Sequence, residues 1–137
     1  MTQTRWNFTT GTNGDTVTGA NTGSNGVVLS GGTGTLSNAQ TTIGTFSALM
    51  TATSTSGVCY WQKTGMSTSA LNFDLYLYVT AAPSSAVSIA WAGTGSREVS
   101  LELNSNRTLT YKNASYTSVW TSTYAIPLNT WVRVAAY

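Results

Sequence analysis

The carboxylates are the first residues to test for chemistry, since hydrolysis of a glycosidic bond uses two carboxyl groups roughly 5–9.5 Å apart. The whole chain has four acidic residues. Glu98 and Glu102 are four positions apart, which in a strand puts them on one face with about 13 Å between their backbones. Side chains that lean together close part of that gap. Glu98 and Glu102 are therefore either a catalytic pair or two solvent-facing strand residues, and we expect the second.

Other catalytic and metal-binding chemistry has little support in the sequence. The chain has no histidine, which excludes Ser–His–Asp and Cys–His catalysis and histidine-ligated zinc. Its one cysteine, Cys59, lies in the apolar run Val58–Trp61 and is expected to be a small buried side chain. The segment Asn13–Asp15 could belong to a calcium loop, but calcium takes six or more oxygen ligands, and we expect a local turn. We predict no metal, no cofactor and no enzymatic activity.

Aromatic side chains are the strongest candidates for a binding site, because sugar rings stack on planar aromatic faces and tyrosine hydroxyls add directional hydrogen bonds. Tyr76 and Tyr78 are two residues apart on the polar side of the clearest predicted strand, so they project from one face. Tyr116, Trp120 and Tyr124 are further candidates in predicted loops or weak strands. The alternative is that Tyr76 and Tyr78 pack against a second sheet or a neighbouring subunit. We take Tyr76, Tyr78, Tyr116 and Trp120 as the candidate glycan-binding residues.

Short strands are the elements that must position these residues. Residues 71–80 alternate strictly between apolar and mostly polar side chains, which predicts a half-buried strand. The same pattern predicts strands at 86–92 and 99–103, a hairpin turn at Asn104–Arg107 and a return strand through Leu109 and Tyr111. Weaker strands are expected at 26–30, 45–52, 58–62, 118–124 and 130–136. The inward positions include Val87, Ile89, Trp91, Val99, Leu101 and Leu103, and Trp61 and Trp131 are expected in or near the core.

The expected fold is all-β, an antiparallel sandwich of two sheets. Roughly nine or ten short strands separated by Gly, Asn and Ser clusters are typical of such sandwiches, and helix signals are weak. We predict a single domain over residues 1–137, with a loop-rich N-terminal part at 1–45 in which Trp6 plugs one end. Tyr137 falls inside a strand-like run, so we expect a sandwich that is incomplete at its C-terminus or is completed by a partner.

The composition narrows the class of protein. Only 7% of residues are charged and the net charge is +2 without a basic cluster, which argues against a nucleic-acid partner. No apolar run approaches the roughly 20 residues of a membrane helix. The chain contains 26 Thr and 17 Ser, a balance typical of extracellular surfaces, yet its first residues lack the apolar segment of a signal peptide. Assembly into a virus particle inside the host cell would reconcile these observations.

Three segments resemble the concanavalin A-like jelly roll of lectins, glucanases and laminin-G domains: residues 71–80, the hairpin 101–111 and the Trp-containing strand 127–134. The resemblance covers residues 45–137 and implies a jelly roll. In this family further strands usually follow the Trp strand, so the resemblance also implies an incomplete sandwich. The family's glucanases carry an Asp between their two acids, where this chain has Ser100, and this departure speaks against a hydrolase.

Short domains rich in Thr, Ser and Gly also resemble virion-surface proteins of tailed phages. We therefore expect a non-catalytic structural and adhesive protein on the virion surface, a capsid decoration, head-fibre or tail module assembled in the host cytoplasm. Its expected partners are other virion subunits, further copies of itself and a cell-surface glycan. One alternative is a soluble, extracellular, lectin-like carbohydrate-binding module. Another is a glycoside hydrolase fragment centred on Glu98 and Glu102.

Overall fold

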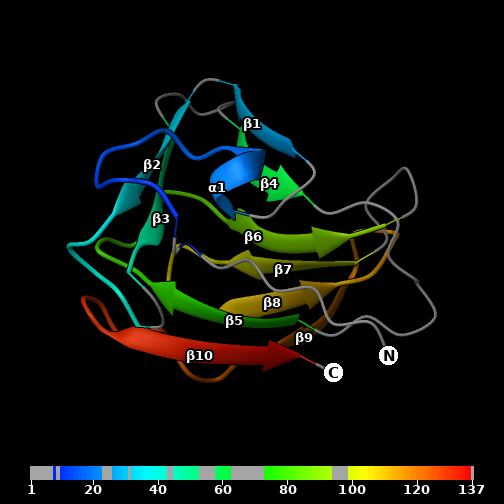
Figure 1. The fold of residues 1–137 in the computed structure, drawn as a ribbon. Helices are drawn as coiled ribbons and strands as arrows, with labels where there is room; N and C mark the ends of the chain where they lie inside the picture. Colours follow the sequence, from blue (N-terminus) through cyan, green and yellow to red (C-terminus); the bar gives the residue numbers. More distant parts are fainter. Residues whose placement is uncertain are drawn as a thin grey trace. The chain divides into compact units, whose positions relative to one another are not determined.

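Short antiparallel strands make up almost all of the regular structure, as the alternating sequence predicts (Figure 1). The computed structural model describes residues 8, 10–22, 26–30, 32–42, 45–52, 58–62, 73–93 and 99–136. Within these ranges the expected all-β class is confirmed. The chain divides into two compact units, Met1–Met66 and Ser67–Tyr137, and each is described by itself.

The first unit contains two antiparallel ribbons and one helical turn. Strand β1 (Gly26–Ser30) pairs with β4 (Val58–Gln62), and β2 (Gly32–Ser37) pairs with β3 (Ser47–Ala52). The turn α1 (Gly19–Thr22) begins at a reciprocal cap. In this cap Asn21 Oδ1 accepts the Thr18 N–H, and Thr18 Oγ1 accepts the Asn21 N–H. The buried centre of this unit is formed by Val17, Leu36 and Phe46, with Phe8, Ala48 and Met50 packed against them.

Strand β2 was not expected, because in the loop-rich part at 1–45 the sequence predicts a strand only at 26–30. Its glycines have low strand propensity, so the local sequence argues against a strand. Tertiary contacts override that preference. Leu36 is buried, and its N–H donates to the Asp15 carbonyl, while the Val17 N–H donates to the Gly34 carbonyl. The segment around Thr16 therefore lies along one edge of β2, and β3 lies along the other.

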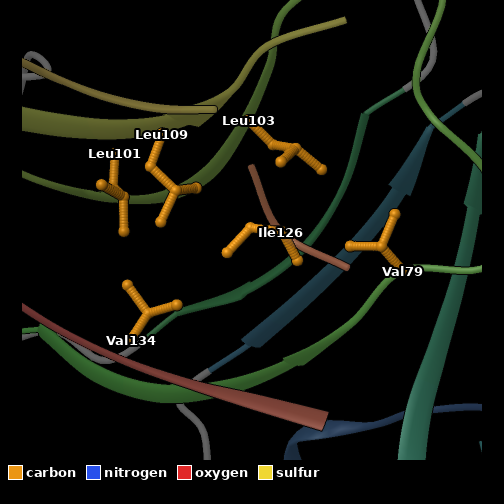
Figure 2. Close-up of a cluster of buried hydrophobic side chains, with 6 residues drawn as sticks. All are labelled: Val79, Leu101, Leu103, Leu109, Ile126 and Val134. Atoms are coloured by element: carbon orange, nitrogen blue, oxygen red, sulfur yellow. The ribbon is translucent and has the colours of Figure 1, made fainter. Parts of the chain in front are cut away.

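The second unit is a two-layer β-sandwich. One layer is the ribbon of β5 (Phe73–Tyr78) and β10 (Trp131–Ala136); the other is a sheet of β6 (Val87–Ala92), β7 (Val99–Leu103), β8 (Leu109–Lys112) and β9 (Ser118–Thr121), in that order. Figure 2 shows the buried side chains between them, which are Val79, Leu101, Leu103, Leu109, Ile126 and Val134. Leu75, Leu77 and Val132 of the ribbon pack against this cluster. The apolar positions Leu75 and Leu77 of β5 and Leu101 and Leu103 of β7 therefore face inward, as their alternation predicts.

A β-bulge in β6 overturns the prediction that Trp91 points into the core. The register with β7 shifts between Ser88 and Ala90, so that one extra residue enters β6. Ile89 and Ala90 both pack against the core, and the alternation is then reversed. Trp91 lies opposite Ser100 on the other face of the sheet and is 40% exposed, and Val87 at the start of β6 is also exposed.

Two hairpins in this unit share one turn geometry, built on the sequences Asn104–Thr108 and Asn113–Thr117. In each, the asparagine N–H donates to the final threonine carbonyl, and the fourth residue donates its N–H back to the asparagine carbonyl. The fourth residues, Arg107 (φ 67°) and Tyr116 (φ 59°), take the left-handed conformation. The predicted hairpin is confirmed, and its positive φ falls on Arg107, where a three-residue hairpin loop places its left-handed residue.

Several predictions fall outside the described residues. These concern Trp6, Glu98 and Tyr137, and the side chains of Cys59 and Trp61. Among the described residues, no helix is long and apolar enough to cross a membrane.

The core assignment predicts a large difference between two leucines of the second unit. Leu101 is 1% exposed and Leu128 is 38% exposed. We expect Leu101→Ala to lower the free energy of unfolding by about 2–5 kcal/mol, because it leaves a cavity in the core. We expect Leu128→Ala to lower it by about 1 kcal/mol or less. Urea unfolding followed by tryptophan fluorescence measures both, and equal losses would contradict the layered core.

Candidate functional site

The ribbon β5–β10 has two chemically different faces, because successive side chains on a strand point to opposite sides. Its inner face carries the aliphatic side chains that pack on the core. Its outer face is defined by the ladder, in which Tyr78 lies opposite Trp131 and Tyr76 lies opposite Arg133. We call this outer surface the aromatic face; it consists of Asp74, Tyr76, Tyr78, Trp131 and Arg133.

An aromatic pair forms one half of the aromatic face. The rings of Tyr78 and Trp131 are tilted by 57° with their centroids 5.3 Å apart, within the range of favourable edge-to-face contacts. Both side chains are half-buried, and the indole Nε1 of Trp131 is buried without a hydrogen-bond partner. Tyr76, one step further along β5 on the same face, is 42% exposed. A planar ring is thus partly exposed to solvent beside a half-buried aromatic pair.

An ion pair between Arg133 and Asp74 forms the other half of the aromatic face. The Arg133 Nε donates to Asp74 Oδ1 at 3.0 Å, and its Nη2 donates to Asp74 Oδ2 at 2.7 Å. This two-point geometry holds the guanidinium and the carboxylate in one plane. Both side chains are about half exposed, so the pair adds little to stability. Its main consequence is to fix polar donors and acceptors next to Tyr76, with their charges mutually neutralised.

The structure divides the four predicted binding residues between different places. Tyr76 and Tyr78 lie together on the aromatic face, as their spacing predicts. Tyr116 lies at the turn between β8 and β9, and Trp120 lies on β9, where it lines a cleft together with Tyr124. All three of these side chains are more than half exposed. The candidate site therefore contains only the first two of the predicted residues.

Sequence analysis missed three members of the aromatic face. Trp131 was predicted to lie in or near the core; it is half-buried with a buried indole Nε1, whereas Val132 and Val134 of β10 pack in the core cluster. The alternation of residues 131–135 could have indicated the side of Trp131, since it places Trp131 on the same side as Arg133. The pairing of Arg133 with Asp74, 59 positions away, had no such signal because it depends on which strands are neighbours.

The prediction that Glu102 faces solvent is wrong. Glu102 is 7% exposed on the face of the four-stranded sheet opposite the hydrophobic core, and its Oε2 lies 2.7 Å from Lys112 Nζ. Ser100, next to it on that face, is also buried, and its Oγ has no hydrogen-bond partner. The carboxylate of Glu102 thus has a structural partner. Glu98, the other half of the hypothetical catalytic pair, is outside the described residues.

Asp15 has the local turn role expected of it. Its Oδ2 accepts the Thr12 N–H at 2.7 Å, and its own N–H donates to the Thr12 carbonyl at 3.0 Å. Gly14 in this turn has a φ of 92°, which suits glycine. In the described part of the chain, no group of three or more His, Cys, Asp and Glu residues is arranged to hold a metal ion.

Comparison of the chain with protein-family models, with curated proteins and with solved structures finds no match.

The two ion pairs of this unit should differ in their effect on stability. Replacing Lys112 by Met leaves the buried Glu102 carboxylate without its cation, and we expect a loss of about 3 kcal/mol or more. The double variant Lys112→Met/Glu102→Gln should recover part of that loss. The matched control Arg133→Met removes the exposed cation of the aromatic face and should cost about 1 kcal/mol or less. Chemical denaturation of the wild type, of Lys112→Met, of Glu102→Gln, of their double variant and of Arg133→Met gives these values, and strict additivity of Lys112→Met and Glu102→Gln would contradict the buried pair.

Proposed function

We propose that this chain is a non-catalytic adhesive module that binds carbohydrate on the aromatic face. The observation that carries the proposal is the placement of Tyr76, Tyr78 and Trp131 on one side of the β5–β10 ribbon, next to the Asp74–Arg133 pair with its two hydrogen bonds. A sugar ring presents an apolar face of C–H groups and an edge of hydroxyls. A site for it needs an aromatic surface and fixed polar groups side by side.

The role of each side chain in the proposed site follows from its chemistry. Tyr76 is the most accessible ring and would stack on the apolar face of the sugar. The Asp74 carboxylate accepts hydrogen bonds from sugar hydroxyls, and the Arg133 guanidinium donates to them. Because these two charges neutralise each other, the site favours a neutral saccharide over a strongly acidic one.

The proposed setting is the surface of a tailed-phage particle, where the module would act as a capsid decoration, head-fibre or tail component. The support is compositional: few charges and many hydroxyls keep a β-rich chain soluble. The concanavalin A-like resemblance of residues 45–137 points to the same class of sandwich. A free lectin-like module would use the same aromatic face in a different setting. The hydrolase alternative has the weakest support, since the Glu102 carboxylate is held by Lys112.

Glycan binding should depend on Tyr76. We expect Tyr76→Ala to weaken binding by about tenfold or more, because it removes the exposed ring on which the sugar stacks. The matched control is Tyr124→Ala, which removes another exposed tyrosine outside the aromatic face. A glycan array with the wild-type chain identifies a ligand, and calorimetric titration of the three proteins with it gives the affinities. Unchanged binding by Tyr76→Ala, or an equal loss in Tyr124→Ala, would contradict this site.

Arg133→Lys tests the planar ion pair separately from charge. Lysine keeps the positive charge but cannot make the two parallel hydrogen bonds to Asp74. We expect a several-fold weaker affinity for the same glycan, with a change in unfolding free energy of about 1 kcal/mol or less because the pair is half exposed. Full affinity in Arg133→Lys would show that the orientation of the guanidinium does not matter.

A further inference from the structure

An open cleft of about 280 Å³ lies beside the β5–β10 ribbon. The four consecutive residues 132–135 line it, and no described residue of β5 does. Neighbouring side chains of a strand point to opposite sides, and β5 covers one edge of β10, so the cleft runs along the other edge of β10. Leu109, Ile126 and Val134 of the core also line it. The second unit is therefore open along this edge.

The indole of Trp120 is accessible because of this opening. Trp120 lies opposite Tyr111 of β8, and Tyr111 lies opposite Leu101 of β7, so the three side chains project from the core-facing side of the sheet. Leu101 is 1% exposed, whereas Trp120 is 55% exposed and lines the cleft together with Tyr124. A large aromatic ring on the core-facing side of the sheet is thus left available to a ligand.

The lining of the cleft combines aromatic rings with uncharged polar groups. Arg133 is the one charged residue among the described lining residues, and Asp74 on β5 already binds its guanidinium through two hydrogen bonds. Thr123 adds a hydroxyl, and the unpaired edge of β10 adds backbone donors and acceptors. A neutral sugar requires this chemistry, and the volume of the cleft lies close to the lower end of small-molecule sites, at about 300 Å³.

The cleft and the aromatic face share strand β10. Arg133 lies opposite Tyr76 in the ladder and also lines the cleft. Opposed residues of an antiparallel pair have their Cα atoms about 5 Å apart, so little more than the width of one strand separates Tyr76 from the cleft. Ala135, the next residue on the same side of β10 as Arg133, is exposed and has a single methyl group as its side chain. A linear oligosaccharide stacked on Tyr76 can therefore cross β10 at this small residue.

We propose that the cleft is a second subsite for carbohydrate and that the chain recognises a neutral oligosaccharide rather than a single sugar. This inference rests on the proposed function, because the aromatic face is its first subsite. One sugar unit stacks on Tyr76, the glycan crosses β10 at Ala135, and a further unit stacks on Trp120 in the cleft. Affinity then increases with the length of the glycan, since an oligosaccharide contacts both subsites at once.

Titration calorimetry with glycans of increasing length tests the second subsite. The probes are linear oligosaccharides of glucose, galactose, mannose and N-acetylglucosamine, each compared with its own monosaccharide. In the series that binds best, we expect the tetrasaccharide to bind about tenfold or more tighter than the monosaccharide, which exceeds the statistical gain from repeated units. Trp120→Ala should lose most of this length-dependent gain, whereas Tyr76→Ala should weaken both ligands. Tyr124→Ala should cost less affinity for the tetrasaccharide than Tyr76→Ala, because the aromatic face is the primary subsite.

The matched control is Trp91→Ala, which removes a 40% exposed tryptophan on β6, outside both the aromatic face and the cleft. It should keep the full length-dependent gain. A second readout does not depend on the folding of Trp120→Ala. In the wild-type chain, the indole N–H NMR signal of Trp120, assigned with the Trp120→Phe variant, should shift when the tetrasaccharide is added.

The possible results distinguish a failure of the second subsite from a failure of the proposed function. If no probe binds, both are overturned. The second subsite alone is overturned if binding depends on Tyr76 but does not increase with glycan length beyond the statistical gain. The same holds if Trp120→Ala keeps the length-dependent gain, if Trp91→Ala loses it equally, or if the Trp120 signal does not shift.

Discussion

The constraint on which the second unit depends is the antiparallel register of β5 with β10, in which Tyr78 faces Trp131 and Leu77 faces Val132. A shift of one residue in either strand would exchange its two faces and bury its polar and aromatic side chains. Packing of the aliphatic face against the four-stranded sheet fixes that register. The exposed aromatic face is thus a consequence of the same ladder that builds the core, and the proposed binding depends on the register that also stabilises this unit.

In this chain, hydroxyl and amide side chains make the polar contacts that charged side chains make in most soluble domains. Asn104 Nδ2 donates to the hydroxyls of Thr108 and Thr110, and the Thr110 and Thr121 hydroxyls lie 3.0 Å apart across β8 and β9. Ser122 Oγ accepts the Leu109 N–H. Such short local bonds hold hairpins in register without a long charged side chain, so a chain with 7% charged residues can still satisfy its polar groups. They also leave the exterior with few charges.

Sequence periodicity predicted the existence of most strands and the inward side of β5 and β7, because both depend on local alternation. It failed where contacts between distant segments determine the side, the strand or the burial of a residue. The bulge in β6 reversed the side of Trp91, and glycine-rich β2 pairs with β3 despite its low strand propensity. Glu102 was predicted to face solvent but is buried and paired with Lys112. For the candidate site, spacing placed Tyr76 and Tyr78 together. Trp131 and Arg133 of β10 could not be assigned to the same site, because local sequence does not determine which strands are neighbours in a layer.

The central claim is that one face of the β5–β10 ribbon is core and the other is an accessible aromatic surface. Paramagnetic relaxation of side-chain NMR signals by a soluble, uncharged gadolinium chelate tests it most directly, because the broadening falls steeply with distance from solvent. The account predicts strong broadening for Tyr76 and Arg133, and protection for Leu75, Leu77, Val132 and Val134. Equal broadening of the two sets, or protection of Tyr76 with exposure of Val134, would contradict it.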